Sequence, residues 1–277
     1  MTSVDQPWGN LAVNDERVSV NGQEIALARF GEGPALVILH GIGSRATSWA
    51  PVAEQLAAAY EVIAIDHRGH GASSHPATGY LIDDYTDRLG LKRPLVMGHS
   101  LGGMTTLEWA RRHPDRAAAI VLEDAPMRRG GSGVEELFDG WIALSQMTVE
   151  EARARYAAEN PDWSAVDIAR RADAITSVAP GVFVELKANM LLQGGISMTP
   201  TYAGIVSPVL LVYGDVETGG MVPGFDATAF GGTVPNAELA HIAGGSHSLH
   251  RDSPEAFLAA ADPFLARFAP DASRYRG

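Results

Sequence analysis

The chain has 277 residues, of which 46% are hydrophobic and 19% charged, so it can bury a large core and is not expected to be disordered. Its formal net charge of −12 argues against nucleic acid or an anionic membrane as the main partner, because both attract clusters of Lys and Arg. The chain has no cysteine, which excludes disulfides, thiolate metal sites and a cysteine nucleophile.

The N-terminal segment, residues 1–10, has neither a basic start nor an apolar stretch, so it does not have the pattern of a signal peptide. No apolar run approaches the ~20 residues that a membrane helix requires. We therefore expect a soluble, cytoplasmic protein with no membrane partner.

The first half of the chain alternates between strand and helix patterns. Residues 17–20 and 25–28 flank Asn21-Gly22, a sequence that favours a hairpin turn. Continuous apolar runs, typical of strands buried on both faces, occupy residues 35–39, 62–65, 95–97 and 118–122. Helical patterns occupy residues 51–59 and 104–112, with a short helix of about three turns at best over 80–90.

The pattern changes in the second half. Residues 127–202 contain no clear strand, and helical patterns there occupy 134–144, 149–159, 165–174 and 181–192. Strand patterns return at 209–213 and 238–242, and Ser253-Pro254 opens a terminal helix. Strands that alternate with helices predict an α/β domain with a mostly parallel sheet. We expect one domain, with its core at residues 16–126 and 204–277 and an inserted helical cap at about 127–203.

The most informative motif is Gly98-His99-Ser100-Leu101-Gly102-Gly103, which follows one predicted strand and precedes a predicted helix. A strand, a tight turn and a helix with serine at the apex form the context of a nucleophile elbow. The strained turn leaves no room for side chains two residues to either side, which explains Gly98 and Gly102.

Three further motifs occur in a fixed order around this one. They are His40-Gly41-Ile42-Gly43 after an early strand, the D-H-R-G-H-G-A-S run at residues 66–73, and Gly244-Gly245-Ser246-His247 near the end. Together the four motifs resemble the α/β-hydrolase superfamily over nearly the whole chain. The resemblance implies a mostly parallel sheet of about eight strands flanked by helices, with a helical cap over the C-terminal strand edge. The stretch from Ser73 to Leu95 is shorter than is usual in that superfamily.

The resemblance also implies site residues. Ser100 is the expected nucleophile, and His247 is the expected base, since a serine hydroxyl needs a base tuned near pH 7. His250 is the alternative base. The backbone N–H groups of Ile42 and Leu101 are the expected oxyanion hole.

Three carboxylates compete for the acid that would orient the histidine. Asp215 is preferred because aspartate is the commoner acid and because this residue lies nearest the end of the strand at 209–213. Glu217 fits the family spacing, although residues 218–222 lengthen this loop. Asp124 ends the preceding strand, where some family members place their acid.

Apolar side chains could line a substrate pocket, and we expect Trp49 and Trp141 among them, although such residues more often form core. Arg128 and Arg129 could pair with an anionic substrate, although a solvated face suits them better. No metal-binding or nucleotide-binding motif is present, so we expect no metal and no cofactor.

The sequence therefore predicts a cofactor-independent serine hydrolase that acts on a small-molecule substrate. A carboxylesterase that cleaves a small, apolar ester through an acyl-enzyme is the preferred interpretation. The same triad could instead open a lactone, cleave a C–C bond or act as a perhydrolase, since one fold hosts many reactions. A ligand sensor without turnover is the alternative of a different class.

Overall fold

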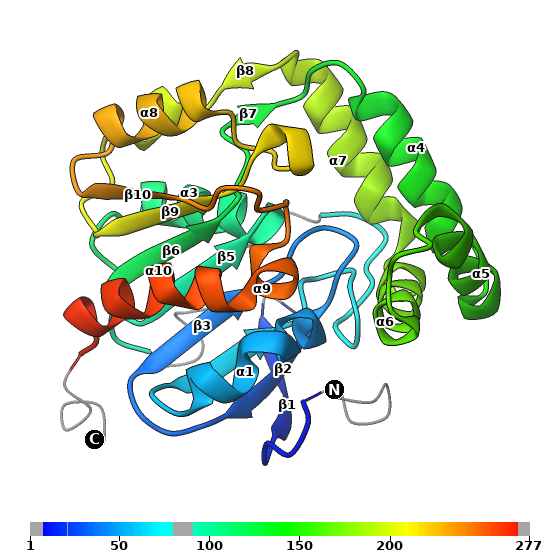
Figure 1. The fold of residues 1–277 in the computed structure, drawn as a ribbon, viewed down its shortest axis with the longest axis horizontal. Coiled ribbons are helices and arrows are strands. Elements are labelled where there is room, and N and C mark those ends of the chain that lie inside the picture. Colours follow the sequence, from blue (N-terminus) through cyan, green and yellow to red (C-terminus); the bar gives the residue numbers. More distant parts are fainter. Residues whose placement is uncertain (1–7, 21, 80–90, 271–277) are drawn as a thin grey trace.

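The computed structural model describes residues 8–20, 22–79 and 91–270. Its centre is an eight-stranded sheet of order β1-β2-β4-β3-β5-β6-β9-β10 (Figure 1). The strands are β1 (Asn14–Val20), β2 (Gln23–Phe30), β3 (Ala35–Leu39), β4 (Glu61–Ile65), β5 (Leu95–His99), β6 (Ala119–Glu123), β9 (Val209–Tyr213) and β10 (Ala237–His241). The β1–β2 and β2–β4 pairings are antiparallel and all others are parallel. The predicted, mostly parallel eight-stranded sheet is confirmed.

Helices cover both faces of this sheet (Figure 1). The helices of the core are α1 (Ala50–Ala57), α3 (Leu101–Arg112), α8 (Gly224–Thr233), α9 (Leu249–Asp252) and α10 (Pro254–Phe268), with short 3-10 turns η1 (Ala46–Trp49), η2 (Thr199–Tyr202) and η3 (Val216–Thr218). Successive side chains of a strand point to opposite faces of the sheet, so alternate residues pack with the helices on each face. In β3, Leu36 and Ile38 pack with α1 and α10, whereas Val37 and Leu39 pack with α3 and α8.

Four helices lie between β6 and β9 in the chain and gather on one side of the sheet (Figure 1). They are α4 (Val134–Ser145), α5 (Val149–Glu159), α6 (Ala165–Thr176) and α7 (Pro180–Gln193). We call them the cap helices. They bury their own apolar cluster, which includes Phe138, Ile175 and Phe183. The cap helices are fastened to the core by an Arg45–Asp173 ion pair and by the Ala179 amide, which donates to the Gly69 carbonyl at 2.8 Å.

Two elements differ from the sequence prediction. A short antiparallel pair, β7 (Arg128–Arg129) with β8 (Ile196–Ser197), joins the two ends of the cap segment, where no strand was expected. Helix α8 was also not predicted. The helix expected over residues 80–90 lies outside the described residues.

No single helix in the described part of the chain is both long and apolar enough to span a membrane. Helices α6 and α7 meet the criterion only when taken together, across an 80° bend.

Close backbone contact makes Gly102, in the first turn of α3, hard to replace. A Cβ built at Gly102 would lie 2.4 Å from the Leu39 carbonyl oxygen and 2.7 Å from that of His40. We expect Gly102→Ala to lower the free energy of unfolding by about 3 kcal/mol, since backbone atoms must move apart. Gly232→Ala in α8, where no atom lies within 4 Å, is the control and should raise it by up to about 1 kcal/mol. Urea denaturation measures both, and similar effects at the two sites would contradict this packing argument.

Candidate active site

Ser100 occupies a strained turn between β5 and α3. Its backbone has φ of 51° and ψ of −114°, a conformation that is unfavourable for a residue with a Cβ. The turn is held by two hydrogen bonds: the Ser100 amide donates to the Glu123 carbonyl at 3.0 Å, and the Met104 amide donates to the Ser100 carbonyl at 2.9 Å. The structure thus places this serine at the apex of a strand–turn–helix, the geometry that the motif predicts.

The loop after β3 packs directly against this turn. A Cβ at Gly41 would lie 2.7 Å from Nδ1 of His99 and 3.2 Å from Cβ of Ser100, so only glycine allows the approach. Ile42 and Leu101, which flank the contact, both line the same cavity as Ser100. Their backbone N–H groups therefore belong to segments that meet beside the serine.

Three buried histidines hold this loop in place. The His67 amide donates to Nε2 of His40 at 3.1 Å, and Nδ1 of His40 donates to the Gly41 carbonyl at 2.7 Å. The Gly43 amide donates to Nε2 of His70 at 3.3 Å. Burial lowers the pKa of His67 to about 4 and that of His70 to about 3, and it holds the pKa of His40 well below its usual value. All three rings are therefore neutral near pH 7, as the acceptor roles of His40 and His70 require, and Nε2 of His67 donates to the His40 carbonyl at 2.8 Å.

These lowered pKa values predict a loss of stability in acid. Unfolding returns each pKa to about 6.5, so the unfolded chain binds more protons than the folded one once the pH falls below that value. The loss should begin near pH 6.5 and continue to about pH 4 for His67 and about pH 3 for His70. At pH 5 we expect a cost of about 2 kcal/mol for each of these two histidines. Urea denaturation at pH 7, 6 and 5 measures the unfolding free energy. In His70→Gln this free energy should fall less steeply as the pH is lowered. An unfolding free energy that stays constant over this range would contradict the assignment.

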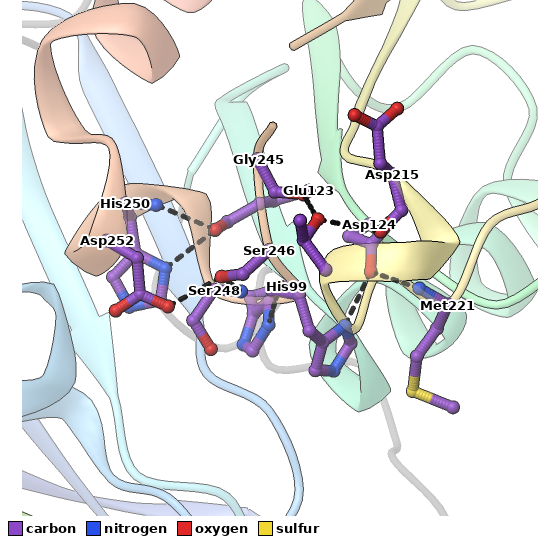
Figure 2. Close-up of polar contacts among 12 residues, drawn as sticks. His99, Glu123, Asp124, Asp215, Met221, Gly245, Ser246, Ser248, His250 and Asp252 are labelled. Atoms are coloured by element: carbon purple, nitrogen blue, oxygen red, sulfur yellow. Dashed lines mark hydrogen bonds and ion pairs between the residues drawn. The ribbon is translucent and has the colours of Figure 1, made fainter. Parts of the chain in front are cut away.

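His247 is paired with a fully buried carboxylate at the end of β6. Its Nδ1 lies 2.6 Å from Oδ2 of Asp124. The same oxygen accepts the Met221 amide at 2.7 Å (Figure 2). The Asp124 side chain is 0% exposed and that of His247 is 27% exposed. When Nδ1 donates to the carboxylate, the Nε2 lone pair is left free to accept a proton. His247 and Ser100 line the same cavity.

The prediction that Asp215 would orient His247 is wrong. Oδ1 of Asp215 lies 2.5 Å from Nε2 of His241, and its Oδ2 accepts the Gly244 amide at 2.6 Å. These two hydrogen bonds, the Gly244 bond first, lower the pKa of Asp215. Figure 2 shows its carboxylate pointing away from Asp124. Asp215 therefore fastens β10 to the loop that carries His247, and Glu217 is exposed on η3.

Two neighbours of the pair were not identified from the sequence. The buried carboxylate of Glu123 accepts both the backbone amide and Nδ1 of His250 at 2.8 Å, which fixes α9 just after His247 (Figure 2). Nε2 of His99 donates to the His247 carbonyl at 2.9 Å, and the centroids of the two imidazole rings lie 4.7 Å apart. Burial, with the nearby His247 and His250 rings, holds the pKa of His99 well below its usual value. Both contacts position the His247 loop. His250 itself bonds to Glu123, not to Asp124.

A cavity of about 610 Å³ opens beside Ser100 and His247 and extends under the cap helices. Its apolar lining includes Ile42, Met104, Phe138, Trp141, Leu144 and Met190. Trp141 therefore lies where the sequence analysis expected it. The expectation that Trp49 lines the pocket is wrong, because its side chain is fully buried in the core. It stacks on the ring of His250, with 4.2 Å between the ring centroids.

The remaining candidate groups lie elsewhere. Arg128 forms an ion pair with Asp226 at 2.8 Å and does not line the cavity. Within the described ranges, no group of three or more His, Asp or Glu side chains could hold a metal ion.

Comparison with known proteins gives this arrangement its family. Residues 36–261 match the alpha/beta hydrolase family. The chain is 27% identical over 263 residues to a 2-(acetamidomethylene)succinate hydrolase of Mesorhizobium japonicum, covering 90% of this chain and 94% of that protein.

Solved structures agree on the fold. An esterase from Thermogutta terrifontis has a TM-score of 0.73 at 22% identity, covering 93% of this chain and all of that one. An enol-lactonase from Burkholderia xenovorans has a TM-score of 0.73 at 21% identity, covering 91% and 100%. Because the match to the alpha/beta hydrolase family covers residues 36–261, most of the chain, the chain belongs to that family.

Proposed function

We propose that this hydrolase uses Ser100 as nucleophile, His247 as general base and Asp124 as the group that orients the base. The observation that carries the proposal is the convergence of a strained serine and a carboxylate-bound histidine on one cavity, although 146 residues separate them. Such a pairing activates a hydroxyl that is otherwise a poor nucleophile near pH 7. The buried carboxylate of Asp124 would hold the ring in one tautomer and stabilise its protonated form.

The reaction would run through an acyl-enzyme. Nε2 of His247 takes the proton of Ser100 while Oγ attacks the substrate carbonyl carbon. The backbone N–H groups of Ile42 and Leu101 donate to the oxyanion, each contributing roughly 3 kcal/mol to transition-state stabilisation. The leaving group departs with the proton from His247. Water then gives a proton to His247 while its oxygen attacks the acyl carbon. The bond from the acyl carbon to Oγ breaks, His247 returns the proton to Oγ, and the acid leaves.

We propose a carboxylic ester as the substrate. The cavity is lined in part by apolar side chains of the cap helices, Trp141 among them, and its volume suits a small acyl compound. No metal or cofactor is needed for this chemistry. The cap helices would set the size of the substrate and exclude water.

Amide hydrolysis is the second candidate. It is supported by the relative from Mesorhizobium japonicum, whose name describes a substrate with an acetamido group. The same three residues could perform this reaction, provided that His247 protonates a leaving amine. Lactone opening, C–C cleavage and perhydrolysis use the same nucleophile and are separated only by the pocket.

The test is a substrate panel of p-nitrophenyl esters, p-nitroanilides with the same acyl groups, lactones and β-diketones. We expect the short esters to be turned over fastest. Turnover of the anilides without the esters would favour the amide candidate, and no turnover of any short ester would reject the esterase proposal. A fluorophosphonate probe separates a serine hydrolase from a ligand sensor: a folded protein whose Ser100 is not labelled would favour the sensor.

A further inference from the structure

Two arginines line the same cavity as Ser100 and come from different elements. Arg171 comes from α6 of the cap helices, and Arg251 comes from α9, four residues after His247. They are close enough for the charge of Arg251 to help lower the pKa of Arg171. Two positive charges that lie near each other repel, so an anion bound between them would stabilise both.

Arg171 lacks the partner that other arginines of this chain have. Arg45, Arg128 and Arg251 each pair with an aspartate, at Asp173, Asp226 and Asp252 respectively. Among the residues that the structure describes, no carboxylate is paired with Arg171, and its buried Nε has no hydrogen-bond partner. Burial, followed by the charge of Arg251, lowers its pKa to about 10, so the guanidinium is still charged near pH 7.

The acidic residues of the cavity do not supply this partner. Glu159 pairs with Arg155 at 2.9 Å and its side chain is 51% exposed. Glu136 lies in the first turn of α4 and is exposed. Both side chains are exposed. The charges of Asp252 and Asp167 favour the charged form of Arg171, but neither carboxylate forms an ion pair with it, so among the described residues the guanidinium lines the cavity without a directly bound carboxylate.

Trp163 orients both guanidiniums. Cζ of Arg171 lies 5.4 Å from the centroid of its ring and Cζ of Arg251 lies 5.7 Å away. Tyr156, which also lines the cavity, stacks on the same indole with 6.1 Å between centroids. Contacts of this kind are attractive and hold the two cations in place before any ligand arrives. An arrangement fixed in advance lowers the entropy cost of binding an anion.

We propose that Arg171 and Arg251 bind a carboxylate on the substrate while Ser100 attacks its acyl carbon. The substrate would then be an acyl compound with an apolar middle and an anionic end. This inference rests on the function proposed above. A guanidinium suits the role because it donates two parallel hydrogen bonds to a carboxylate. The net charge of −12 repels anions at long range, so selectivity for them requires a local cationic site.

The test compares esters that match in size but differ in charge. For the acyl side, the pair is p-nitrophenyl hexanoate and the mono-p-nitrophenyl ester of adipate. For the leaving-group side, the pair is methyl 4-acetoxybenzoate and 4-acetoxybenzoate. We expect kcat/KM to favour the anionic ester at least tenfold in one pair, and Arg171→Gln to reduce that ratio at least tenfold. Arg170→Gln, which changes the neighbouring arginine that does not line the cavity, should leave the ratio unchanged. Arg251→Gln is the second variant should Arg171→Gln not fold.

A binding measurement separates this inference from the proposed function. Calorimetry of Ser100→Ala with adipate should show binding that Ser100→Ala/Arg171→Gln has lost, whether or not any ester is turned over. Ester turnover with no preference for the anionic partner in either pair would overturn the inference and leave the esterase proposal standing. Equal loss on neutral and anionic esters in Arg171→Gln would also overturn it. Inorganic phosphate that binds more tightly than adipate would overturn the carboxylate assignment.

Discussion

Ser100→Ala is expected to lower kcat on the best ester by a factor on the order of 10⁵, because the attacking oxygen is removed and only binding and the oxyanion donors remain. KM should change little, since the hydroxyl does not define the shape of the cavity. Steady-state kinetics with p-nitrophenyl esters measures the loss, and the fluorophosphonate probe should no longer label the protein. A residual rate within tenfold of the wild type would show that the serine is not the nucleophile.

The stability of Ser100→Ala should stay within about 1 kcal/mol of the wild type. Ser100 is only 6% exposed and lies beside the cavity. Alanine keeps the Cβ and therefore the strain of the positive φ, and only one hydroxyl is lost. Thermal unfolding measures this. A large drop in stability would assign the loss of activity to misfolding.

Asp124→Asn is expected to lower kcat by about 10⁴-fold, because the amide no longer selects the tautomer of His247 that frees Nε2. The change conserves size, so the variant should fold. Its pH–rate profile should also change, since the charged partner of the imidazole is gone. Activity and its pH dependence measure the effect.

Asp215→Asn and Glu217→Gln are the matched controls and should lower kcat less than about threefold. The Asp215 carboxylate contacts His241 and Gly244, and Glu217 is exposed on η3. Three equal, modest losses at positions 124, 215 and 217 would contradict the pairing of Asp124 with His247.

Continuous apolar runs and tight-turn motifs made much of the fold predictable. The run at Ala35–Leu39 is typical of a strand buried on both faces, and the observed β3 has these bounds. Helix α8 was not predicted because Gly224, Gly231 and Gly232 weaken its helical pattern. The β7–β8 pair was not predicted because a strand of two residues has no recognisable periodicity. The pair forms only where the two ends of the cap segment meet.

Some residues of the candidate site were also predictable from the sequence, and others were not. Ser100 and His247 are marked by local glycine-rich turns, whereas the choice of acid depends on where side chains point in space. Asp124 and Asp215 both follow the ends of neighbouring parallel strands, β6 and β9, so the sequence places them almost equally well. The backbone of Asp124 turns to a φ of 41°, which no pattern of residue types announces. Trp49 and Trp141 are both apolar and large, and only the fold separates core from cavity.

The pairing of β5 with β6 places His99 opposite Glu123, so the next residue on each strand is a member of the proposed triad, Ser100 or Asp124. The adjacent carboxylates of Glu123 and Asp124, at the end of β6, then bind His250 of α9 and His247 of the preceding loop, so the proposed site depends on strand register. A slip of β6 by a single position would send both carboxylates to the wrong side of the sheet. The nucleophile and the acid of the proposed triad therefore depend on the central strands β5 and β6, whereas the cap helices supply much of the cavity lining.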